Sequence, residues 1–132
     1  ERVNCLNDIK DTNDFKTFLV NFKRLNNIIK SNKLLDISNV KLNIHLFESS
    51  EEEEIYDKSK NLDINLKNYL TDLEHQGIIL KEVINLHYVI HSFFEKIIVN
   101  HEDKKIKINR IKLLTELTER ILKFSNFHYI EN

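Results

Sequence analysis

The sequence predicts an all-α fold, a four-helix-type bundle with a long crossover between its first two helices, and three observations indicate it. The 132 residues include no proline and a single glycine, Gly77, so the chain lacks the residues on which tight turns depend. Apolar residues recur at the three- and four-residue spacing of amphipathic helices. The length is typical of one domain with one core. We therefore expect a single helical domain over residues 1–132.

The first helix is predicted from about Thr12 to Leu35. Asp11 or Thr12 can cap its amino end, and Asp14 places a negative charge where the helix dipole favours one. Three phenylalanines share a single helical stripe with aliphatic residues, so this helix should supply much of the core. The stripe consists of Phe15, Phe18, Leu19, Phe22, Leu25 and Ile29.

A crossover, Asp36 to Ser49, is expected next. Within residues 40–46 apolar and polar side chains alternate, which is the pattern of a half-buried strand. Because no second strand is present to pair with it, we expect an extended or short helical segment. The alternative is a strand that pairs with its twin in a dimer. A connection of this length can join helices that lie parallel.

The second helix is predicted to begin at Ser50, since four acidic residues follow and Ser50 with Glu53 fits a capping box. Gly77, the single glycine of the chain, follows later in this region. Glycine commonly ends a helix in the left-handed conformation, so we expect a break there, with a third helix from Ile78 to Val99. Because the three- and four-residue spacing continues through the glycine, one unbroken helix from Ser50 to Val99 is the alternative.

The third helix should lie at the centre of the bundle, because its apolar stripe covers more than a third of its circumference. A short connection, Asn100 to Asp103, leads to a fourth helix that extends to about Phe127. The connections near Gly77 and Asn100 are both short, which predicts antiparallel neighbours.

One group of residues has the spacing of metal ligands. His87, His91 and Glu95 lie four residues apart along one flank of the third helix, and histidines at this spacing can share a metal ion. Tyr88, however, occupies the position at which zinc proteases carry a glutamate. We predict no catalytic residues, no cofactor and no metal site, and retain these three residues as the candidate ligands.

The charges are nearly balanced, with 20 basic and 21 acidic residues. Such a balance argues against a dedicated nucleic-acid binder, which normally has a basic face. The most basic stretch, KKIKINRIK at 104–112, is interpreted as a solvated helix face balanced by nearby acids. The sequence therefore predicts no nucleic-acid partner.

The chain begins with Glu1 and contains no methionine. We expect a mature product or a fragment of a larger protein, with a secreted or exported location favoured. Its only cysteine, Cys5, is expected to be an unpaired thiol, with an intermolecular disulfide as the alternative. No apolar run is long enough for a transmembrane segment. Abundant Asn, Ile, Lys and Leu without alanine indicate an AT-rich genome.

These observations lead to a functional hypothesis based largely on missing motifs. One glycine cannot build a phosphate-binding loop, and no nucleophile motif is present. We therefore predict a non-enzymatic helical protein–protein interaction module whose surface includes Tyr56, Tyr88 and Val99, the last two exposed in a monomer. The alternatives are a carrier of an apolar ligand such as a lipid and a scaffold that acts as a homodimer.

Overall fold

The computed structural model describes residues 13–35, 37, 39–69 and 73–129, and for 65–69, 73–79 and 124–129 only the backbone. Four α-helices account for most of this chain, and no strand occurs in the described part. The all-α prediction is confirmed, and the alternative of a strand in the crossover is wrong. The elements are α2 (Asn13–Ser31), the 3-10 turn η1 (Ile44–Leu46), α3 (Ser50–Tyr69), α4 (Leu73–Lys96) and α5 (Lys104–Tyr129).

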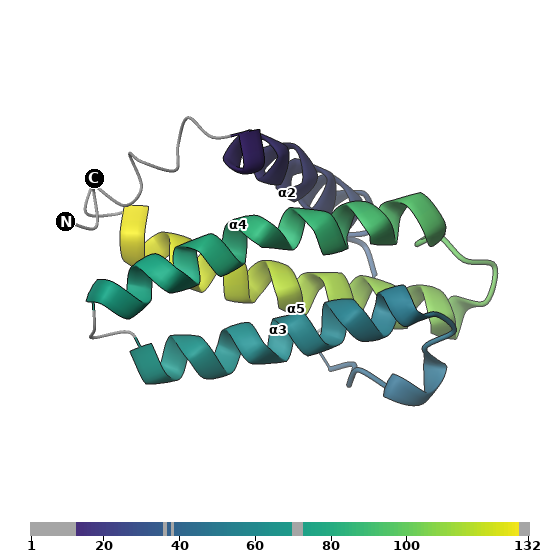
Figure 1. Ribbon diagram of the computed structural model, residues 1–132. Helices are drawn as coiled ribbons and strands as arrows, with labels where there is room; N and C mark the ends of the chain where they lie inside the picture. Colours follow the sequence, from purple (N-terminus) through teal and green to yellow (C-terminus); the bar gives the residue numbers. More distant parts are fainter. Residues whose placement is uncertain (1–12, 36, 38, 70–72, 130–132) are drawn as a thin grey trace.

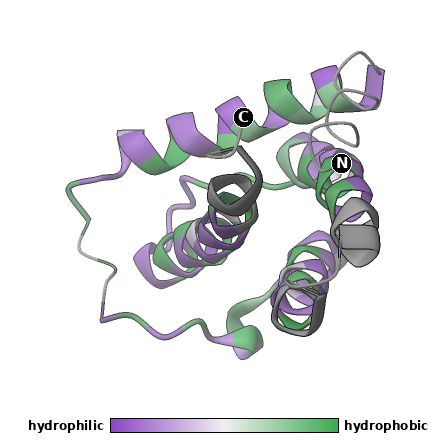
Figure 2. Ribbon diagram, turned by 90° about the vertical axis from the view of Figure 1, so that its left-hand side faces the viewer, coloured by the Kyte–Doolittle hydropathy of each residue, from purple (hydrophilic) through white to green (hydrophobic). Residues whose placement is uncertain are grey.

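Three of the helices lie side by side, and the first crosses them. In Figure 1, α3, α4 and α5 run along one another with alternating direction. Viewed along their axes in Figure 2, α2 is seen lengthwise. It packs mainly on α4 and α5, not on α3. The length of the crossover predicts that it joins two helices that lie parallel and adjacent. This prediction is wrong, because α2 packs on α4 and α5 and not on α3. The crossover passes around the outer side of α5 to reach α3.

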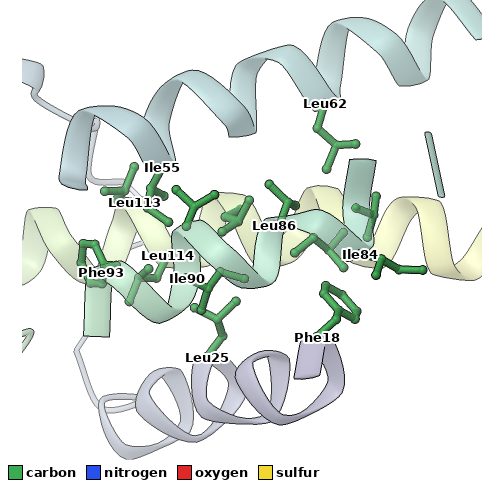
Figure 3. Packing of buried hydrophobic residues seen from close by; sticks show 14 of the residues in the cluster. Phe18, Leu25, Ile55, Leu62, Ile84, Leu86, Ile90, Phe93, Leu113 and Leu114 are labelled. Atoms are coloured by element: carbon green, nitrogen blue, oxygen red, sulfur yellow. The ribbon is translucent and has the colours of Figure 1, made fainter. Parts of the chain in front are cut away.

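The core lies where α2 and α3 meet α4 and α5 from opposite sides. Leu25, Ile90 and Phe93 are fully buried there, and Phe18 and Ile84 lie beside them (Figure 3). The expected central position of the third helix is confirmed, because residues 80–96 of α4, whose side chains are described, contribute seven buried apolar residues, and α4 contacts both α2 and α3. Within the described residues, no helix combines the length and apolar character needed to cross a bilayer.

The break between the second and third helices does not occur at Gly77. α3 ends at Tyr69 and α4 begins at Leu73, so Gly77 lies inside α4 with ordinary helical backbone. Both the expected glycine cap and the alternative of one unbroken helix are wrong. A glycine inside a helix costs only about 1 kcal/mol, whereas folding α4 back onto α3 buries apolar residues such as Leu62 and Leu86.

The amino end of α3 is capped one residue earlier than predicted. The Ser49 hydroxyl accepts the backbone N–H of Glu52 at 3.3 Å and donates to the Glu52 carboxylate at 3.0 Å. That carboxylate also accepts the backbone N–H of Glu48 at 3.0 Å. The capping box is therefore Ser49–Glu52 and not Ser50–Glu53. The buried position of Glu52, which has no exposed surface, selects this register.

Candidate functional site

The near-neutral total charge conceals a separation along the chain. Residues 13–47 carry six basic and two acidic residues, and residues 104–132 carry seven basic and three acidic. Residues 48–103, between them, carry five basic and thirteen acidic residues. The two basic segments form α2, the crossover and α5, and α2 packs on α5. The molecule therefore has a basic side and, on α3 and α4, an acidic one.

Two stretches without any acidic residue adjoin on the basic side. They are residues 37 and 39–47 of the crossover and residues 104–115 of α5, and together we call them the acid-free surface. Asn43 and Asn109 join them by two reciprocal hydrogen bonds, from the Asn43 backbone N–H at 2.8 Å and to its carbonyl at 3.0 Å. The Lys112 ammonium lies 3.5 Å from the Ile37 carbonyl.

The lysines of the acid-free surface are available to an anion. Lys41, Lys104 and Lys105 are exposed, and none forms an ion pair with any described residue. Some cations elsewhere in the described chain are paired with acids, as Lys96 is with Glu51 at 3.5 Å and Arg120 is with Asp63 at 3.9 Å. The two stretches carry no carboxylate, and a neighbouring acid, Asp103, lies at their edge, where its carboxylate accepts the backbone N–H of Lys105 at 2.9 Å.

Arg110 belongs to the same stretch of α5 but points inward. Its guanidinium donates to the Ile98 carbonyl at 2.7 Å, to Glu48 at 2.9 Å and to Glu52 at 3.3 Å. The Arg110 side chain is buried, and so is that of Glu52. It therefore ties the end of the crossover, the start of α3 and the loop after α4 to α5.

α2 extends the basic side. Lys16, Lys23 and Lys30 are seven residues apart, so they lie on one stripe of the helix, and all three are exposed. None of them forms an ion pair with a described residue. Arg24, on a neighbouring stripe, lies 4.4 Å from the centre of the Phe94 ring of α4 and helps to hold α2 in place.

The three residues of the predicted protein-interaction surface do not share one environment. Tyr88 is 63% exposed, and its hydroxyl donates to Asp14 at 3.4 Å. Val99, expected to be exposed, is only 5% exposed, because α4 ends before it and the chain turns back onto the core. Tyr56 is half-buried, with its ring 5.8 Å from that of Phe47 in an edge-to-face arrangement.

The candidate metal ligands also separate. The buried His87 lies 3.1 Å from the Asp14 carboxylate on α2, whereas the exposed His91 lies 3.7 Å from Glu95 on its own helix. The described residues contain no group of three side chains placed to hold a metal ion. Cys5 lies outside the described residues.

Comparison with known proteins decides the family. Residues 18–125 match the DALR anticodon binding domain. The chain belongs to this family. The match includes most of α2, the crossover and most of α5, and it contradicts two predictions made from the sequence. The DALR domain is a nucleic-acid-binding domain, so the expectation of no nucleic-acid partner is wrong. The prediction of a protein–protein interaction module is wrong for the same reason, and so are its lipid-carrier and homodimer alternatives.

Relatives of this DALR domain are beta subunits of glycine–tRNA ligase. The subunit of Buchnera aphidicola from Schizaphis graminum is 27% identical over 130 residues, which is 98% of this chain and 18% of the relative. That of Thermodesulfovibrio yellowstonii is 31% identical over 119 residues, 90% of this chain and 17% of the relative. The chain thus spans less than a fifth of these relatives. The family is defined by binding and not by catalysis, although the relatives are ligases.

The residues missed in the sequence are those of the acid-free surface. The sequence shows that the stretch 104–112 is basic, but its positive charge is interpreted as balanced by four nearby acids, Glu102, Asp103, Glu116 and Glu119. None of these four acids forms an ion pair with a lysine of this surface. The available signal was the charge of each segment taken separately, because a total of −1 averages a basic side with an acidic one.

Proposed function

We propose that this DALR domain binds the anticodon arm of a tRNA as part of a glycine–tRNA ligase beta subunit. The family description and the named activity of the relatives support the proposal. The chain would contribute binding, and the ligase reaction would take place elsewhere in the assembled enzyme. This division agrees with a sequence that lacks phosphate-binding loops and nucleophile motifs.

The acid-free surface carries the proposal. tRNA presents closely spaced phosphates, and most of the affinity of proteins for nucleic acid comes from lysine and arginine contacts with them. Lys41 and Lys105 offer unpaired ammonium groups on two elements that Asn43 and Asn109 hold together. The stripe of exposed lysines on α2, a helix that packs on α5, adds further positive charge.

The proposal is tested by removing charge from one side of the molecule at a time. The double variant Lys41→Gln and Lys105→Gln should bind a fluorescent glycine tRNA about tenfold or more weakly, because two phosphate contacts lose their cations. The matched control is Lys58→Gln with Lys81→Gln, which removes two exposed lysines from α3 and α4. Fluorescence anisotropy at one fixed salt concentration measures both affinities.

The control should retain nearly the affinity of the unmodified protein. Equal losses in the two double variants would contradict the placement of the interface, since total charge alone would then account for binding. Absence of any tRNA binding by the unmodified protein would contradict the proposed function itself.

A further inference from the structure

We propose that the turn η1 contacts unpaired bases of the RNA through Ile44 and His45, while the surrounding lysines bind phosphates. The inference rests on the proposed function and goes further, because it assigns base recognition to particular side chains. It divides the acid-free surface into a sequence-tolerant part, formed by the lysines, and a part that recognises exposed nucleobases.

Two of the three side chains of η1, those of Ile44 and His45, are directed to solvent. Ile44 is 49% exposed, and His45 is exposed as well. The His45 imidazole forms no hydrogen bond or ion pair with any described residue. The flanking Leu42 and Phe47, in contrast, pack against the core. An apolar and a ring side chain are therefore presented next to each other, with their backbone anchored on both sides.

The turn is held by hydrogen bonds within it and from α5. The Asn43 side chain accepts the backbone N–H of His45 at 2.9 Å, and the Phe47 N–H donates to the Ile44 carbonyl at 3.2 Å. Asn109 of α5 holds the Asn43 backbone from outside the turn through the reciprocal hydrogen bonds. A preorganised turn loses little further conformational freedom on binding, so its contacts translate more fully into affinity.

The chemistry of the turn suits single-stranded RNA. Proteins recognise unpaired bases by stacking them on flat side chains, histidine included, and by hydrogen bonds to the base edges. His45 provides a flat ring with free nitrogen atoms, and Ile44 provides an apolar surface beside it. Lys41 lies three residues before Ile44, so a phosphate next to the bound base has a cation within the same segment.

Other exposed side chains of similar type lie in a different electrostatic setting. Ile64 on α3 is 51% exposed, almost as much as Ile44. His91 on α4 is also exposed, but it lies beside Glu95. Both belong to the acidic segment 48–103, which repels the RNA backbone. They serve as matched controls because they offer the same side chains outside the proposed interface.

The experiment separates base contacts from phosphate contacts. Two stem-loop RNAs are compared, one with the anticodon loop of a glycine tRNA and one whose loop nucleotides lack bases but retain every phosphate. The variant His45→Ala should bind the intact loop about five- to a hundredfold more weakly, the range for loss of one stacked base. Ile44→Ala should weaken the same binding by a smaller factor, because it removes an apolar contact and no ring. The affinity of both variants for the abasic loop should equal that of the unmodified protein.

Ile64→Ala and His91→Ala should leave both affinities unchanged, and thermal unfolding followed by circular dichroism checks that all four variants fold. Equal losses on both RNAs, or no loss on either, would overturn the role of the turn while leaving the proposed function standing. If the unmodified protein bound neither RNA, the proposed function would fail and this inference with it.

Discussion

Cationic residues in the same stretch of α5 have different roles, and only their contacts distinguish them. Lys105 and Arg110 are both cations of one basic stretch, yet Lys105 is exposed while the guanidinium of Arg110 is buried against Glu48 and Glu52. Asn109, next to Arg110, binds the crossover, because its side-chain amide donates a hydrogen bond to the Asn43 carbonyl. In the sequence the stretch predicts only an amphipathic basic helix. Which cation is free and which is internal depends on carboxylates more than 50 residues away.

Arg110 should therefore be required for stability. Replacing it in the variant Arg110→Met leaves the buried Glu52 carboxylate without its cation, and such a loss typically costs about 3–5 kcal/mol. Urea unfolding would measure this decrease in the free energy of unfolding. The double variant Arg110→Met with Glu52→Gln should recover part of the loss, since no uncompensated charge stays buried. A single variant within about 1 kcal/mol of the unmodified protein would contradict the role assigned to Arg110.

At the scale of elements, helices were predictable and their ends were not. The amphipathic spacing located all four helices, and the start of α3 was predicted to within one residue, since Ser50 is its first residue and not its cap. The break after α3 was placed at Gly77 because glycine is a common helix end, whereas the chain turns between Tyr69 and Leu73. A glycine inside a helix lowers the stability of that helix by about 1 kcal/mol relative to alanine. The burial of a few apolar side chains outweighs this cost.

The capping of α3 provides a prediction at this scale. Ser49→Ala removes both the hydroxyl that accepts the Glu52 N–H and the donor to the Glu52 carboxylate, so we expect a loss of about 1 kcal/mol. Ser50→Ala, one residue later, should change the free energy of unfolding by less than half as much. Thermal or urea unfolding of the two variants compares them directly. A larger effect at Ser50 would restore the capping box originally predicted from the sequence.

For the whole molecule, the distribution of charge matters more than its sum. Packing of α2 on α5 brings two basic segments from distant parts of the chain together. The acidic segment between them forms α3 and α4. A protein with a net charge of −1 can therefore present a basic face to a polyanion.

This separation predicts a steep salt dependence of tRNA binding in spite of the nearly neutral total charge. The logarithm of the association constant should fall linearly with the logarithm of the salt concentration. In the variant Lys41→Gln with Lys105→Gln, the slope should decrease by about 0.7–0.9 for each lysine. In His45→Ala it should stay unchanged, since no phosphate contact is lost. A salt-independent affinity would contradict binding through the basic side.

The sequence by itself determined the helical class, the four amphipathic helices and the central position of α4, because these follow from local periodicity and the near absence of turn residues. Only the tertiary structure decided where α3 gives way to α4, which serine caps α3 and that Val99 is buried. It also decided that residues 39–47 and 104–115 adjoin each other. These features depend on contacts between residues far apart in the chain, whose energies exceed the local preferences that a sequence displays.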